Sequence, residues 1–204
     1  MNSKCKKTNY SDCDIDSTRK VDRVVWSYTD NGNTFKDEEI IEFQKDEKEK
    51  TMKKAICIGY NPAQCEKKLD TTNKRLAKML WEDYDGYTLK NLYTQVTPDA
   101  ATCDLSLAGN NDSINEIAAR IESEEDTIIL FWGCTAVVDN MIIGALEKRE
   151  KKKTSHNGSC FRTMYTKGKN RNGEEIFIHP GSQDGTKLAD FVFDKNVKTT
   201  NVIR

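Results

Sequence analysis

The stretch KAICIGYNPA, residues 54–63, determines the fold that we expect for this chain. Its short apolar run ends in glycine, asparagine and proline, a pattern typical of a buried strand followed by a loop. Pro62 fixes its own φ and disfavours a helical conformation at Asn61, so the loop is stiff at the asparagine. Ligands of open α/β sheets bind at the carboxyl ends of the strands. Asn61 is therefore the first candidate functional residue.

Strand and helix patterns alternate along the rest of the chain. Polar residues 1–20 lack periodicity and predict a flexible N-terminal arm, and we expect one α/β domain over residues 21–204. The Asn31-Gly32 pair predicts a type I′ turn in an N-terminal β-hairpin. The order of the later patterns favours a three-layer α/β/α sandwich with a mostly parallel central sheet. Strand patterns occupy residues 23–28, 34–43, 87–93, 127–132, 161–166 and 175–178, and helical patterns follow residues 69–73, begin at Ser113 and cover residues 135–147.

Net charge is small, but charge is distributed unevenly along the chain. The 204 residues carry a formal charge of −1, so overall charge does not indicate a protein that binds polyanions. Residues 147–171 hold nine basic residues and two acidic ones. Such an excess can bind phosphates, and it is equally compatible with a solvated helix end followed by a loop. The candidate DNA contacts in this segment are Lys151, Lys152, Lys153 and Arg162.

Cysteine and histidine usage argues against a metal site and against a secreted protein. The seven cysteines form no C-x-x-C motif and their number is odd, so neither a disulfide framework nor a zinc ribbon is indicated. With two histidines in total, we expect no metal and no cofactor. Reduced thiols predict a cytoplasmic location. No apolar run approaches 18 residues, so we expect no membrane contact, and no obligate protein partner is predicted.

Polar and aromatic residues gather where four predicted strands end. The segments are GYNP at residues 59–62, NLY at 91–93, WG at 132–133 and HPG at 179–181. If the strands are parallel, these ends meet at one edge of the sheet. A carboxamide presents a donor and an acceptor in one plane, which suits the edge of a heterocyclic base. A histidine can donate a hydrogen bond to developing negative charge, and an aromatic ring can stack on a base.

Each of these candidates also has a simpler structural role. Asn61 before proline can be a turn former, and Asn91 can bond a neighbouring loop. His179 can be a core histidine that is satisfied by its neighbours. Asp70 precedes a helical pattern and can be its N-cap.

Four motifs resemble the uracil-DNA glycosylase superfamily, in its mismatch-specific and single-strand-selective branches. GYNP at residues 59–62 resembles its G-x-N-P loop, and LKNLYTQVT at 89–97 resembles the segment whose asparagine holds the flipped pyrimidine. ILFWGCTA at 129–136 resembles its L-W-G-x-x-A strand, and IHPGS at 178–182 resembles its H-P-S loop. The chain also resembles an uncharacterised bacterial family with an N-P-S loop, a D-P-T-x-x-R helix start and an H-P-L loop. LDTTNKR at residues 69–75 is similar to that helix start.

The sequence departs from the superfamily at two positions. Members with a G-Q-D-P-Y-H loop carry a water-activating aspartate, and Asn61 stands there in this chain. Residues 181–185, GSQDG, replace the leucine wedge that follows H-P-S. Glycines in these loops fit a larger, modified pyrimidine better than uracil itself.

The resemblance implies a monofunctional DNA glycosylase that excises a modified pyrimidine, in DNA repair or in defence against phages with modified DNA. In this reading His179 polarises the base carbonyl, Asn61 orients the attacking water and Asp70 accepts its proton. No lysine is among the catalytic candidates, so no Schiff-base lyase is expected. The base would be bound by Gly59, Tyr60, Asn91 and Tyr93, and Ser182 would join the four basic residues as a DNA contact.

Two other classes of protein remain open on the sequence. The same strand ends could bind or hydrolyse a small nucleotide without contacting duplex DNA. The chain could also be an inactive sandwich that serves as a scaffold.

Overall fold

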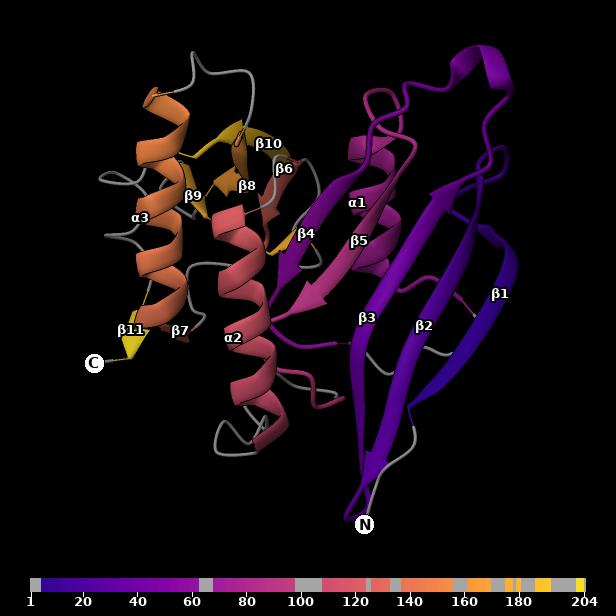
Figure 1. Cartoon of the computed structure of the whole chain (residues 1–204). Helices are drawn as coiled ribbons and strands as arrows, with labels where there is room; N and C mark the ends of the chain where they lie inside the picture. Colours follow the sequence, from indigo (N-terminus) through magenta and orange to yellow (C-terminus); the bar gives the residue numbers. More distant parts are fainter. Residues whose placement is uncertain are drawn as a thin grey trace.

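A mixed β-sheet forms the centre of the protein in the computed structural model (Figure 1). The structure describes residues 5–62, 68–97, 108–123, 126–132, 137–155, 161–169, 175–177, 179–180, 186–191 and 201–203. The strands of the main sheet are β1 (Lys6–Asp14), β2 (Lys20–Asp30), β3 (Asn33–Phe43), β4 (Ala55–Gly59), β5 (Gly86–Asn91), β6 (Thr127–Leu130), β8 (Thr163–Lys169), β9 (Glu175–Phe177) and β10 (Lys187–Asp190). The other elements are the helices α1 (Thr71–Leu80), α2 (Ala108–Ser123) and α3 (Asn140–Ser155), the 3₁₀ turn η1 (Glu47–Glu49), and a two-stranded sheet of β7 (Val137–Asp139) and β11 (Asn201–Ile203).

The prediction of a mostly parallel three-layer α/β/α sandwich is wrong. The strand order is β1-β2-β3-β5-β4-β6-β8-β10, with β9 also paired to β8. Only the pairs β5–β4, β4–β6 and β6–β8 of this sheet are parallel, and the other described pairs are antiparallel. The parallel block therefore lies between antiparallel strands on both sides. Alternating strand and helix patterns predicted the parallel block, but they contain no information on which sheet the hairpins join.

The N-terminal hairpin forms as the Asn31-Gly32 turn predicts, and it belongs to the main sheet. Asn31 has φ 48° and Gly32 has φ 79°, the positive values that a type I′ turn requires. β3 pairs with β5, so the hairpin extends the sheet from its parallel block. Residues 6–14 lie in the segment for which we expected a flexible arm, and they form β1 at the edge of the sheet.

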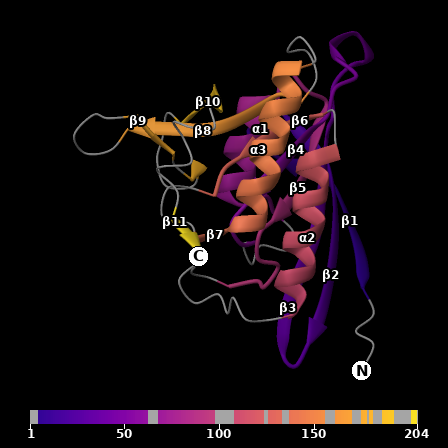
Figure 2. The same cartoon turned by 60° about the vertical axis from the view of Figure 1, so that its left-hand side comes forward.

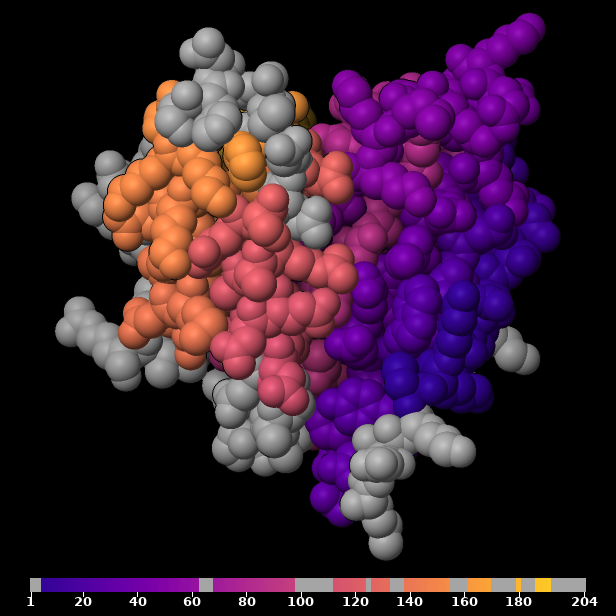
Figure 3. Space-filling view, viewed as in Figure 1, coloured from indigo at the N-terminus to yellow at the C-terminus, as the bar shows by residue number. Residues whose placement is uncertain are grey.

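Two hydrophobic clusters cover opposite faces of the parallel block. On one face, α1 packs Leu76 and Leu80 against β4, β5 and β6. On the other face, α2 and α3 lie side by side and pack Ile117 and Ile142 against the sheet (Figures 1 and 2). In Figure 3, α2 and α3 cover one half of this second face, and β1, β2 and β3 are uncovered in the same view. Among the described helices, α1 packs in one hydrophobic cluster with residues of β1, β2 and β3, whereas α2 reaches β3 through the Arg120–Glu38 ion pair.

Candidate functional site

Three strand ends meet at the carboxyl edge of the parallel block. Gly59 at the end of β4 lies opposite Asn91 at the end of β5 in the strand register. Backbone hydrogen bonds continue past the strands, from Leu92 N to Gly59 O (3.0 Å) and from Phe131 N to Ile58 O (2.9 Å). The residues predicted to share an edge therefore do so on β4, β5 and β6.

His179 reaches the same edge although the strand before it is antiparallel. β8 pairs with β6 as far as Tyr165 and then continues to Lys169, beyond the end of β6. β9 folds back along this overhang, with Phe177 opposite Lys167. The chain thereby returns toward the end of β6, and the ring centroids of His179 and Phe131 lie 5.9 Å apart.

The first turn of α1 lies beside His179. Asp70 is the N-cap of α1, because its side chain accepts a hydrogen bond from Asn73 N (2.8 Å). Arg75 Nη1 donates to Pro180 O at 2.5 Å, which ties the helix to the residue after His179. Burial lowers the pKa of His179, and the Asp70 carboxylate offsets part of that effect. The imidazole is therefore neutral at neutral pH and has one N–H to donate.

Gly59 permits a close approach of two side chains at this edge. A Cβ at residue 59 would lie 2.5 Å from Asn91 Oδ1 and 2.5 Å from Phe131 Cζ. Both neighbours are buried, with 5% of Asn91 and 2% of Phe131 exposed. Any residue with a side chain would displace the amide or the ring. We refer to Gly59, Asn61, Asp70, Asn91, Phe131 and His179 as the strand-end cluster.

Asn61 and the two tyrosines differ in what they can offer to a ligand. Asn61 Nδ2 donates to Thr97 Oγ1 (3.0 Å) and to Thr97 O (3.4 Å), so its amide plane is fixed. Tyr60 is half-buried and meets Tyr93 edge to face, with centroids 5.0 Å apart. Tyr93 is 1% exposed, so its ring is a support for Tyr60 and not a surface on which a base stacks.

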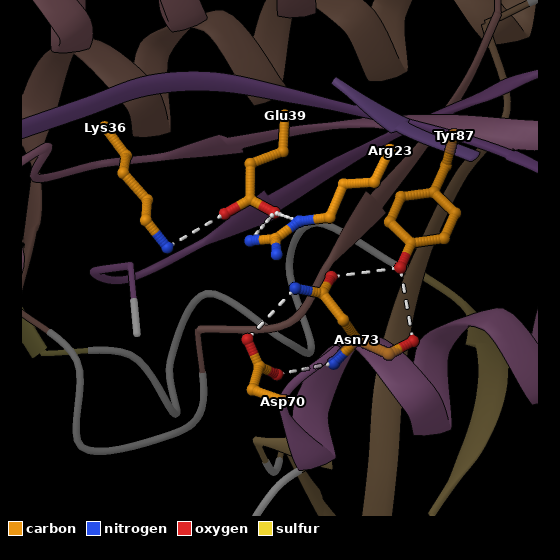
Figure 4. A network of polar contacts seen from close by, with 6 residues as sticks. All are labelled: Arg23, Lys36, Glu39, Asp70, Asn73 and Tyr87. Atoms are coloured by element: carbon orange, nitrogen blue, oxygen red, sulfur yellow. Dashed lines mark hydrogen bonds and ion pairs between the residues drawn. The ribbon is translucent and has the colours of Figure 1, made fainter. Parts of the chain in front are cut away.

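A buried polar network faces the start of α1 (Figure 4). Arg23 donates to Glu39 Oε2 through Nε (2.9 Å) and Nη2 (2.9 Å), and Lys36 lies 3.4 Å from Glu39 Oε1. Asn73 and Tyr87 lie opposite this ion-pair group in Figure 4. All five residues are buried.

Sequence reasoning missed these residues for two different reasons. Asn73 and Arg75 lie inside the helix-start motif at residues 69–75, from which we took only Asp70 as a candidate, as a cap or as a proton acceptor. Charged residues in β2 and β3 gave no signal, because strand charges ordinarily face solvent.

The basic residues predicted to contact DNA lie at the opposite edge of the sheet. Arg149 of α3 donates to the carbonyls of Asp126 and Arg162, which directly precede β6 and β8. The C-terminal end of α3, with Lys151, Lys152 and Lys153, is therefore at the amino edge of the parallel block. Arg162 pairs with Asp190 there and lines a cavity of about 460 Å³ beside the end of α1.

The lysines of this helix end are engaged in local contacts. Lys151 Nζ lies 2.6 Å from Glu147, and Lys153 Nζ lies 3.8 Å from Glu150. Lys152 Nζ donates to Glu122 O at 2.6 Å. The structure does not bring these residues together with the strand-end cluster, and Ser182 lies outside the described residues.

Among the described residues, no group of three or more His, Cys, Asp or Glu side chains could hold a metal ion. No helix in the described ranges is long and apolar enough to cross a membrane.

The fold and the strand-end cluster define an α/β protein with a polar site at the carboxyl edge of its parallel strands. The chain belongs to the family described as "Protein of unknown function (DUF1643)", which matches residues 44–180. The match begins before β4 and ends at Pro180, so it includes the whole strand-end cluster. Comparison with curated proteins gave no match, and comparison with solved structures gave none either.

Proposed function

We propose that this protein is a DNA glycosylase that flips out a modified pyrimidine and hydrolyses its N-glycosidic bond, in DNA repair or in defence against phages. The observation that carries the proposal is the convergence of Asn91, His179 and Asp70 at one sheet edge, with Asn61 on the loop that follows Gly59. A base must leave the helical stack before its glycosidic carbon can react.

His179 is suited to stabilise the leaving base. The transition state of glycosidic cleavage resembles an oxocarbenium ion, so negative charge develops on the base. A neutral imidazole, which the lowered pKa of His179 provides, donates a hydrogen bond without losing its proton to the base. Such a donor contributes about 3 kcal/mol when it behaves like a group of an oxyanion hole.

Asp70 and Asn61 would act on the water. A carboxylate can accept the proton of the attacking water, whereas an amide is too weak a base and can only orient it. The fixed amide plane of Asn61 supports the orienting role. Tyr60 is the candidate for stacking, and with Tyr93 behind it the ring would approach the base from the α2/α3 side of the sheet, opposite the side of Phe131 and His179.

Base release is the direct test. Synthetic DNAs with different modified pyrimidines, as single strands and as duplexes, are incubated with the protein, and released bases are identified by mass spectrometry. We expect release from at least one substrate, and loss of it in His179→Ala and Asn61→Ala at unchanged stability. His156→Ala is the matched control, since it removes the second histidine of the chain. Release that survives His179→Ala, or no release from any substrate, would overturn the proposal.

One observation favours a second candidate, a module that binds or hydrolyses a nucleotide without duplex DNA. The lysine-rich end of α3 lies at the far edge of the sheet, so its charge does not serve a duplex that docks at the strand-end cluster. Lys68 is exposed and lies two residues before Asp70, so it is on the same side of the protein as the strand-end cluster.

Matched lysine variants distinguish the two candidates. If DNA docks at the strand-end cluster, Lys68→Ala weakens binding and lowers the slope of log affinity against log salt by about 1. Lys151→Ala, at the far edge, leaves both quantities unchanged. Affinity for free nucleotides that does not depend on salt, together with no DNA binding, would favour the nucleotide module. If Lys151→Ala is the only variant that lowers the slope of log affinity against log salt, DNA binds at the end of α3, as the sequence predicted.

A further inference from the structure

The start of α1 contacts the His179 segment at two points. Asp70 acts on the imidazole through its charge, and Arg75 donates a hydrogen bond to Pro180 O. The two residues are five positions apart on one helix, so a rigid α1 fixes both contacts at once. The position of His179 therefore depends on how well Asp70 itself is held.

Asn73 holds both oxygens of the Asp70 carboxylate (Figure 4). The backbone N of Asn73 donates to Oδ1 at 2.8 Å, which is the ordinary hydrogen bond of an N-cap. Its side-chain Nδ2 also donates to Oδ2 at 3.0 Å. An N-cap does not require this second hydrogen bond. The second hydrogen bond prevents rotation of the Asp70 carboxylate.

Tyr87 in turn holds Asn73 from the sheet. The Tyr87 hydroxyl lies 3.0 Å from Asn73 Oδ1 and 3.2 Å from Asn73 O. Burial, with the nearby Cys57, Asp70 and Glu39, raises the pKa of Tyr87 well above its usual value, so the phenol stays protonated and donates. A hydrogen bond accepted by Oδ1 directs the other end of the amide, Nδ2, toward Asp70.

We propose that Asn73 and Tyr87 are positioning residues of the candidate site. They hold the Asp70 carboxylate in a fixed place relative to His179, while Arg75 holds the backbone that carries His179. The catalytic consequence rests on the proposed function, but the position and the electrostatics of His179 can be measured without it.

Other groups near the imidazole also affect the pH at which His179 titrates. Phe131 is the ring that packs against His179 from β6. Asp70, the N-cap of α1, is the charged group that acts on the imidazole, and Arg75 of α1 bonds the backbone of the next residue. Cys57 of β4, Glu39 of β3 and Arg23 of β2 act on Tyr87 of β5, one step further from His179.

The test is an NMR titration of a protein with a single histidine. His156→Ala leaves His179 as the only imidazole, so its Cε1–H signal needs no further assignment. We expect Asp70→Asn to make His179 titrate at lower pH, because the carboxylate that favours the charged ring is gone. Asn73→Ala and Tyr87→Phe should move the titration in the same direction by a smaller amount, because the carboxylate is retained but no longer fixed.

Two controls separate positioning from stability. Thr71→Ala changes an exposed residue of the same helical turn, and Met79→Ala weakens packing at the other end of α1. Neither should move the titration of His179. If Tyr87→Phe and Asn73→Ala lower stability like Met79→Ala but leave the titration unchanged, both residues are only structural and the proposal is refuted. Tyr87→Phe retains the ring, so it decides the question even if Asn73→Ala fails to fold.

The kinetic consequence is measured separately. If the protein releases bases, Asn73→Ala should lower kcat roughly 100-fold at little change in KM, the effect of misplacing a catalytic group by about 1 Å. A shifted titration without any base release would support the positioning role and reject the glycosylase. An unchanged titration in a protein that does release bases would support the glycosylase and reject the positioning role.

Discussion

Replacing Gly59 by alanine tests whether the strand-end cluster is as tightly packed as the structure indicates. The added Cβ would lie 2.5 Å from Asn91 Oδ1 and from Phe131 Cζ, and 2.7 Å from Phe131 Cε2. Non-bonded carbon atoms prefer separations of about 3.5–4.0 Å, so the neighbours must move by about 1 Å. Asn91 and Phe131 are both buried and cannot move outward freely.

The expected cost follows from the overlap. Overpacking a filled core by one methyl group costs typically about 1–3 kcal/mol. For a chain of this length, each kcal/mol lowers Tm by about 2–4 °C, so a fall of roughly 2–12 °C is expected. Base release, if present, should fall about 100-fold, because the displaced ring of Phe131 contacts His179.

Gly144→Ala is the matched control for this substitution. Gly144 lies in α3, and a Cβ there would meet nothing within 4 Å. Alanine in a helix is more favourable than glycine by about 1 kcal/mol, so this variant should be as stable as the parent or more so. Urea unfolding with unchanged m-values gives both free energies of unfolding. If Gly59→Ala is as stable as Gly144→Ala, the tight contact among Gly59, Asn91 and Phe131 is refuted.

Two further predictions concern charged groups away from the strand ends. Glu39→Ala should lower the free energy of unfolding by about 3–5 kcal/mol, because it leaves Arg23 buried without this carboxylate, whereas Glu42→Ala, in an exposed pair, should cost less than about 1 kcal/mol. Equal losses in urea unfolding would contradict the buried ion pair. Burial raises the pKa of Asp85, but hydrogen bonds from two backbone amides, with the charge of Lys45, outweigh it and leave the pKa lowered. Its folded-state pKa is then below the unfolded value of about 3.9, so its contribution is present above that pH and is lost as pH falls through the folded-state pKa. Asp85→Asn should therefore be less stable at pH 7 and lose less stability on acidification; an acid transition identical to the parent's would contradict this assignment.

Local structure was predictable where the dihedral preference of a residue, or a hydrogen bond to a near neighbour in sequence, favours one conformation. Asn31 and Gly32 adopt the positive φ values that their pair predicts, and Asp70 caps α1 with its own carboxylate. The apolar run before Gly59 forms β4, buried along its whole length. These features depend on dihedral preferences and on hydrogen bonds within a few residues, so a local sequence pattern is enough to predict them.

The way in which these elements combine could not be predicted from local patterns. A period of two specifies which side chains share a face of a strand, but it does not specify the neighbouring strand, so the antiparallel additions were not foreseeable. Arg23 and Glu39 look solvent-exposed in sequence and are buried because two different strands supply opposite charges. His179 reaches the strand-end cluster because β9 returns along the overhang of β8, and Asn73 faces Asp70 because Tyr87 fixes its amide from the sheet. Each of these arrangements depends on contacts between residues far apart in the chain, which no local pattern encodes.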